Sequence, residues 1–159
     1  MSSSSQNNDA QTKARRIIKR KRRIHAGLGG GFALPYLFPG TGTLVGTAAM
    51  PVELMYVAYS LTDMCHQISE VYGVSSSRPS RAFLAAVLQR AGVIGARHVA
   101  ELGVEVLTLL LGRYILARQA SRIVPLVGIG VGAAFGWHLA NLIGEAAIAE
   151  ARVLASRDA

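Results

Sequence analysis

The stretch that decides the fold lies near the C-terminus, where residues 125–150 read PLVGIGVGAAFGWHLANLIGEAAIAE. It combines apolar residues with a small residue at every fourth position: Gly128, Gly132, Gly136, Ala140 and Gly144. On a helix these five positions form one ridge almost without side chains, which another helix can approach closely. Each glycine in a helix interior costs roughly 0.5–1 kcal/mol relative to alanine. The pattern therefore predicts that close packing along this ridge offsets the cost.

Two kinds of packing fit the ridge, a helix–helix contact inside a membrane and a tight contact in a soluble helical bundle. The same spacing recurs at Gly27 and Gly31 and again at Gly42 and Gly46, so that region is the expected packing partner. The opposite side of the helix is polar, with His138, Asn141 and Glu145 turned away from the ridge at 100° per residue.

The rest of the chain has helical periodicity and no strand-like alternation, so the expected fold class is all-α. Helical hairpins are expected to form a compact, Gly-rich bundle whose apolar surface is compatible with membrane embedding. Gly73 is a C-terminal stop signal, and Pro125 opens the last element. The expected helices span residues 12–25, 41 or 43 to 72, 81–92, 96–121 and 126–156.

Three segments are expected in the domain organisation. Residues 1–11 are rich in Ser, Asn and Gln and predict a disordered tail. Residues 12–25 predict a basic amphipathic helix with a narrow apolar stripe. Residues 26–156 predict a single helical domain.

The positive charge is concentrated in one segment. Of 17 Lys and Arg residues, which face 9 acidic ones, eight lie within eleven positions: Lys13, Arg15, Arg16, Lys19, Arg20, Lys21, Arg22 and Arg23. Subtracting these eight leaves nine basic residues, so the rest of the chain is neutral. The net charge of +8 is therefore a local feature.

An anionic membrane surface is the expected partner of this run. Each Lys or Arg near such a surface contributes about 1 kcal/mol, and cations that precede an apolar stretch hold that end in the cytoplasm. Uncharged stretches at residues 26–52 and 123–144 have the length of a membrane span, although three prolines interrupt the first. Nucleic acid is a rival partner but is disfavoured, because the run lacks an aromatic residue for base stacking. A solubilising tail is the second interpretation, and nucleic acid ranks third.

The sequence contains no recognisable active site. His98, Glu101 and Glu105 share one helix face, as ligands of a metal-dependent enzyme could, but no matching ligands are found elsewhere. A solvated polar face is therefore the favoured explanation. Asp63, Cys65 and His66 are also weak ligand candidates, since residues 65 and 66 point about 100° apart on a helix. We therefore expect no catalytic residues, no metal and no cofactor.

The chain resembles the EcsC family of bacterial proteins. The resemblance covers about residues 25–150 and rests on the order of several Gly/Pro motifs, Gly27-Leu28-Gly29-Gly30 before Leu34-Pro35, Val71-Tyr72-Gly73-Val74, Ile123-Val124-Pro125-Leu126-Val127-Gly128, Gly132-Ala133 and Gly144. The chain departs from the pattern at Gly136, where the family often has Asn, and is shorter than usual members. The resemblance implies an all-helical protein at the inner membrane, linked by the family name to an ABC-transporter and secretion operon.

Together these features predict a non-enzymatic, membrane-associated helical protein that acts through helix packing and protein–protein contacts. Its small-residue ridge would pack against another helix, and its cationic run would bind anionic lipid headgroups. A second copy of the chain or a membrane protein is the expected protein partner. The alternative is a soluble helical bundle whose basic N-terminal segment binds nucleic acid or an acidic protein.

Overall fold

The computed structural model describes residues 3–31, 41–74, 81–92 and 125–157, which form four helices and no strand. These helices are α1 (Ser3–Gly31), α2 (Thr41–Val71), α3 (Arg81–Arg90) and α5 (Pro125–Ala155). The all-α prediction is confirmed for this part of the chain. The helix expected over residues 96–121 lies outside it.

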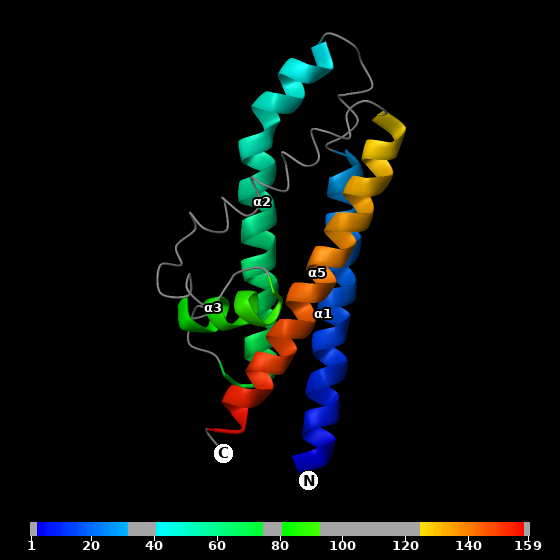
Figure 1. Cartoon of the computed structure of the whole chain (residues 1–159). Helices are drawn as coiled ribbons and strands as arrows, with labels where there is room; N and C mark the ends of the chain where they lie inside the picture. Colours follow the sequence, from blue (N-terminus) through cyan, green and yellow to red (C-terminus); the bar gives the residue numbers. More distant parts are fainter. Residues whose placement is uncertain (1–2, 32–40, 75–80, 93–124, 158–159) are drawn as a thin grey trace.

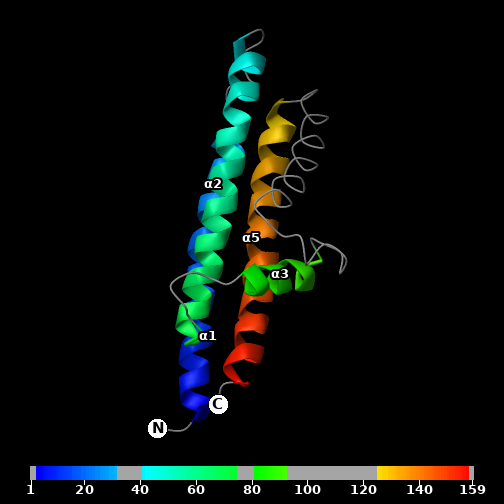
Figure 2. The ribbon, with the colours of Figure 1, turned by 90° about the vertical axis from the view of Figure 1, so that its left-hand side faces the viewer.

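The three long helices run side by side, and the short α3 lies across their direction and projects outward in the lower half of both views (Figures 1 and 2). Among these helices the most extensive contact joins α1 to α5, which are far apart in the sequence. Smaller contacts join α2 to both α1 and α5, and α3 packs on α5. The two chain termini lie at the same end of the bundle (Figure 1).

Small and medium apolar side chains fill the space between the helices. α1 contributes Ala14 and Ile18 to this core, and α5 contributes mostly alanines, among them Ala140 and Ala147 with no exposed surface. Met64 and Ile68 of α2 are also completely buried. Because α5 supplies small residues where α1 supplies Ile18, the two helices approach closely.

Helices α2 and α3 are each followed by a glycine with a positive φ, a backbone conformation that other residues rarely adopt. Gly73 has a φ of 72°, and its amide and that of Val74 donate to the carbonyls of Glu70 and Ser69 at 3.0 Å. Gly92, with a φ of 68°, follows the end of α3 in the same way. These left-handed conformations suit glycine and close the helix with backbone hydrogen bonds, as the stop signal at Gly73 predicted.

The N-terminal segment differs from its prediction. Residues 1–11 were expected to be a disordered tail and residues 12–25 a separate amphipathic helix, but α1 is one continuous helix from Ser3 to Gly31. An ion pair between Asp9 and Lys13, 2.7 Å long, and a hydrogen bond from Thr12 to the carbonyl of Asn8 link its first turns. Packing of Ala14 and Ile18 against α5 then fixes this helix in the bundle.

In the regions that the structure covers, none of the helices is both long enough and apolar enough to cross a membrane.

Candidate functional site

The cationic run occupies the solvent side of α1, but its eight members have different environments. Six side chains are exposed, namely Lys13, Arg15, Arg16, Lys19, Arg20 and Arg23. At 100° per residue these six cover about 160° of the helix circumference, opposite the buried Ala14, Ile18 and His25. We call these six residues the cation face. Lys21 is buried and Arg22 half-buried, so neither belongs to it.

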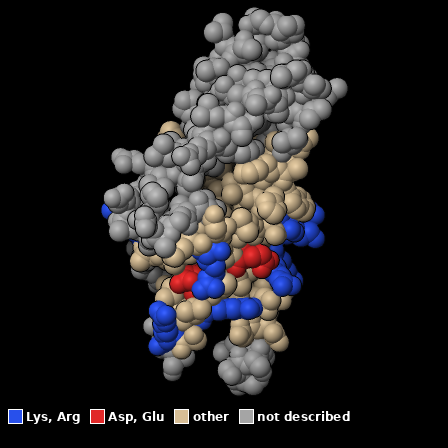
Figure 3. Space-filling view, viewed as in Figure 1, with Lys and Arg blue, Asp and Glu red and all other residues tan. Residues whose placement is uncertain are grey.

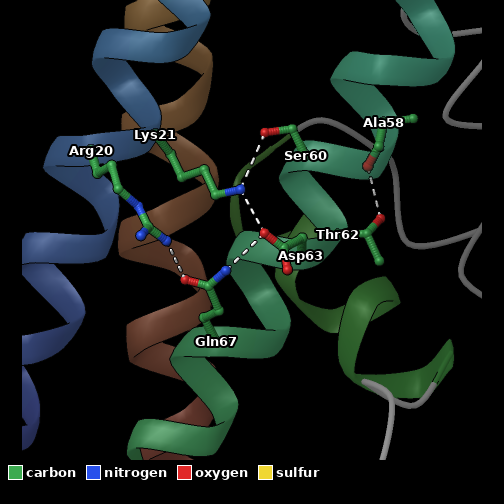
Figure 4. A network of polar contacts seen from close by, with 7 residues as sticks. All are labelled: Arg20, Lys21, Ala58, Ser60, Thr62, Asp63 and Gln67. Carbon is green, nitrogen blue, oxygen red and sulfur yellow. Dashed lines mark hydrogen bonds and ion pairs between the residues drawn. The ribbon is translucent and has the colours of Figure 1, made fainter.

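Lys21 lies in the interface between α1 and α2 and is 7% exposed. Its Nζ is 2.6 Å from Oδ2 of Asp63 and donates a longer hydrogen bond, 3.4 Å, to Ser60 (Figure 4). Gln67 donates to the same Asp63 oxygen at 2.8 Å and accepts a hydrogen bond from Arg20 at 2.8 Å. The network pairs the buried ammonium, so the prediction that Lys21 binds lipid does not fit its place in the fold.

Asp63 is the centre of this network. Burial by itself would raise the pKa of its carboxyl, but hydrogen bonds from Lys21 and Gln67 and the charges of Lys21 and Arg20 have the larger effect. The pKa of Asp63 therefore lies below its ordinary value, and the carboxylate stays ionised beside Lys21.

Arg22 joins the cationic run to α5 on the opposite edge of α1. Its guanidinium lies 4.5 Å from the ring centroid of Trp137 and donates a hydrogen bond of 2.8 Å to Oδ1 of Asn141. Asn141 was expected on the polar side of its helix, but its partner lies 119 positions away in the sequence. No local pattern identifies such a contact, so nothing in the sequence indicates that Trp137 borders the cations.

His25 is buried at the contact between α1 and α5, with 3% of its surface exposed. Desolvation and the nearby charge of Lys21 lower the pKa of its imidazole to about 4, so the ring is neutral near pH 7. Its Nε2 has no hydrogen-bond partner in the part of the chain that the structure covers. His25 thus acts as a core residue at neutral pH.

The small-residue ridge of α5 faces α1. A Cβ placed on Gly136 would lie 2.6 Å from the backbone oxygen of His25, and one on Gly144 would lie 2.6 Å from Cγ1 of Ile18. Ala140, between them, has no exposed surface, and Gly132 is buried. Gly128 lies in the first turns of α5, where side-chain surroundings are not described.

The expected glycine partners of the ridge are placed differently. Gly27 is exposed, and a Cβ added to it would meet nothing within 4 Å, so it makes no close helix contact. Gly31 is the last residue of α1, and Gly42 and Gly46 lie in the first turns of α2. The packing around these three glycines is not among the described features. The described ridge contacts are instead with Ile18 and His25.

The metal-ligand candidates that lie within the described residues do not form a cluster. Within the described residues, no three His, Cys, Asp or Glu side chains gather in a way that would hold a metal ion. Cys65 is buried, which raises the pKa of its thiol to about 12, and His66 pairs with Glu70 at 3.3 Å on the helix surface. His98, Glu101 and Glu105 lie in the segment that the structure leaves out.

Two further surface features were not singled out in the sequence. α2 exposes an apolar strip of Val52, Met55, Tyr56 and Tyr59, whose exposed fractions range from 45% to 74%. The face shown in Figure 3 carries basic and acidic side chains side by side in its lower half. Among the described residues, Arg90 of α3 and Glu150 of α5 form an ion pair between two helices, 3.1 Å apart.

Comparisons with protein-family models, with curated proteins and with solved structures returned no match to this chain.

Proposed function

We propose that this protein is a non-enzymatic helical protein that docks on the anionic cytoplasmic leaflet of a membrane through the cation face of α1. The observation that carries the proposal is the segregation of charge on that helix. Six exposed cations cover its outer side, while its inner side is packed against α2 and α5.

The lack of ion pairs, within the described structure, at four of the six exposed cations supports a surface role. Arg15, Arg16, Lys19 and Arg23 make no ion pair with any other residue of the described chain, whereas Lys13 pairs with Asp9. Four unpaired cations at about 1 kcal/mol each supply about 4 kcal/mol toward an anionic bilayer. Because these charges are exposed, the attraction weakens as salt rises.

Protein contacts are the second part of the proposed function. A bundle held on the membrane by α1 leaves the apolar strip of α2 free to meet a membrane protein or a second copy of the chain. The resemblance to the EcsC family agrees with a membrane-associated role of this kind.

Vesicle sedimentation tests the docking. At low salt the protein should sediment with vesicles of phosphatidylcholine and phosphatidylserine but not with phosphatidylcholine alone. The double variant Arg16→Gln/Arg23→Gln should bind about thirtyfold more weakly, since two cations contribute about 2 kcal/mol.

A double variant with the same net charge is the matched control. Arg81→Gln/Arg157→Gln removes two exposed cations away from α1 and should weaken vesicle binding by less than about threefold. Equal losses in both double variants, or no sedimentation of the original protein at low salt, would contradict the proposal.

A further inference from the structure

Trp137 is the only tryptophan of the chain, and it lies at the edge of the cation face. It belongs to α5 and remains 42% exposed although its ring lies against Arg22 of α1. Arg22 is itself fixed by its hydrogen bond to Asn141, one turn further along α5. The indole is therefore held in a defined position between the two helices.

Exposed cations continue from this position along α1. Lys19 lies one helical turn before Arg22, and Arg15 lies one turn before Lys19. The edge between α1 and α5 thus presents an aromatic ring next to two exposed positive charges. His138 and Glu145 of α5 are exposed too, but they are turned by about 100° and 80° from Trp137 around the helix.

This combination fits a bilayer that carries anionic headgroups. Tryptophan concentrates at the boundary between headgroups and acyl chains, because its ring is apolar and its N–H is polar. Lysine and arginine at the same depth meet headgroup phosphates and carboxylates. A soluble polyanion without exposed bases, such as a DNA duplex, would engage only the cations, and a neutral bilayer only the indole.

We propose that Trp137 is an interfacial anchor, whose exposed edge enters the headgroup region of an anionic bilayer while Lys19 and Arg15 contact the headgroups. The inference rests on the proposed function and adds an orientation to it, because the edge between α1 and α5 then faces the bilayer. Arg22 is the positioning residue, since it stacks on the ring and holds it in place.

The side of the bundle formed by α2, with its apolar strip, is less suited to an anionic surface than the edge between α1 and α5. The apolar strip of α2 is larger, but half-exposed Glu70 follows it on the same helix, about three turns beyond Tyr59 and within about 20° of it around the helix axis. A carboxylate in line with the strip repels anionic headgroups. The geometry therefore favours the Trp137 edge.

The fluorescence of Trp137 tests the anchor without any substitution, since no other tryptophan contributes. With phosphatidylcholine–phosphatidylserine vesicles, emission should shift to the blue, and bromine-labelled lipids should quench it more strongly near the headgroup than at the bilayer centre. Sedimentation of the same samples measures docking independently. Sedimentation with an unchanged Trp137 emission would overturn the anchor and leave the proposed function standing.

Paired substitutions on α5 give a second test. Trp137→Ser should weaken vesicle binding roughly tenfold, because it removes the apolar surface that enters the interface. Leu142→Ser changes an exposed apolar residue turned by about 140° from Trp137, and it should weaken binding by less than about twofold. Circular dichroism checks that both variants remain helical, and equal effects in the two would overturn the anchor.

Two other results would overturn both proposals together. Failure of the protein to sediment with the anionic vesicles at low salt removes the surface that Trp137 is proposed to enter. Tight, salt-dependent binding to a DNA duplex with no vesicle binding would assign the cation face to nucleic acid.

Discussion

At the scale of single residues, Lys21 has an environment different from that of the cations on either side of it in the sequence. It lies in a run of cations, yet it points into the interface of α1 and α2 and meets Asp63 at 2.6 Å. A buried ammonium without a partner is costly, so the carboxylate, Ser60 and Gln67 are what allow Lys21 to be buried.

Removing the carboxylate should therefore destabilise the fold. Asp63→Ala leaves the charge of Lys21 buried and unpaired, and we expect a loss of about 2 kcal/mol in the free energy of unfolding, below the loss for a fully buried pair because Asp63 is 33% exposed. Urea unfolding followed by circular dichroism measures it.

The double-mutant cycle separates the pair from its surroundings. In a Lys21→Met background, Asp63→Ala should cost much less, since no buried charge is left without a partner. As a control, Glu70→Ala removes an exposed carboxylate on the same helix and should change stability by less than about 0.5 kcal/mol. Additive effects of the Lys21 and Asp63 substitutions would contradict the coupling.

His25 gives stability a pH dependence. Its folded pKa of about 4 lies below the ordinary 6.5, so the unfolded chain binds more protons between these values. Stability is therefore highest above pH 6.5 and falls as pH drops toward 4, by about 3 kcal/mol for this group. Urea titrations at several pH values measure the slope.

Substitution of His25 should remove that slope. His25→Leu fills a similar space without titrating, so its stability should change little between pH 6.5 and pH 4. His138→Gln, which replaces an exposed histidine of α5, should keep the slope of the original protein. An unaltered slope in His25→Leu would assign the pH dependence to other groups.

Sequence patterns alone do not separate Lys21 from Arg20 or Arg22. All three are long cations in one run, and their roles depend on Asp63, Gln67 and Asn141, which are contributed by helices distant in sequence. The periodicity of Ala14 and Ile18 indicated the buried side of α1, but not which helix would cover it.

At the scale of helices, boundaries were more predictable than contacts. The last helix was expected over residues 126–156 and spans Pro125–Ala155, and the second was expected to end near residue 72 and ends at Val71. The preference of glycine for the position after a helix, at Gly73, and of proline for the first turn, at Pro125, is enough to predict these boundaries. The partner of the small-residue ridge depends on long-range packing, which no local rule determines.

Alanine substitutions along α5 should separate close packing from helix propensity. Gly136→Ala places a Cβ 2.6 Å from the backbone oxygen of His25, which cannot rotate away, so it should destabilise the fold by about 1–2 kcal/mol. Gly144→Ala meets the side chain of Ile18 instead and should cost less. Thermal unfolding followed by circular dichroism ranks the two.

Two open glycines provide matched controls for these variants. Gly130 of α5 and Gly27 of α1 have nothing within 4 Å of an added Cβ, so alanine at either should stabilise the helix by about 0.5–1 kcal/mol. If Gly136→Ala stabilised the protein as Gly130→Ala does, the close approach of α1 and α5 would be refuted.

At the scale of the whole molecule, α1 is a structural helix and not an appendage. It contributes Ala14 and Ile18 to the core, and it covers the ridge of α5. The interpretation of the cationic run as a solubilising tail considered only its charge. The apolar stripe on the side of α1 away from the cations is narrow, but it lies in the interface with α5, which is the most extensive helix contact of the described structure.

Deletion of residues 1–28 should therefore abolish cooperative unfolding, because α5 then loses the helix that covers its ridge. Differential scanning calorimetry should record no sharp transition for this deletion. Deletion of residues 1–7 removes only the end of α1 before the Asp9–Lys13 pair and should leave the transition midpoint within a few degrees. A cooperative transition in the longer deletion would show that α1 is dispensable.

The pairing of α1 with α5 also has a consequence for synthesis on the ribosome. Of the described helices, α1 is synthesised before the others and its main partner α5 after them, and the contact of Arg22 with Asn141 spans 119 positions. A nascent chain with such distant contacts completes its core slowly and is exposed to aggregation while it waits. The dense positive charge of α1 keeps the waiting helix hydrated, so the same residues that we propose to face the membrane in the finished protein would protect the unfinished one.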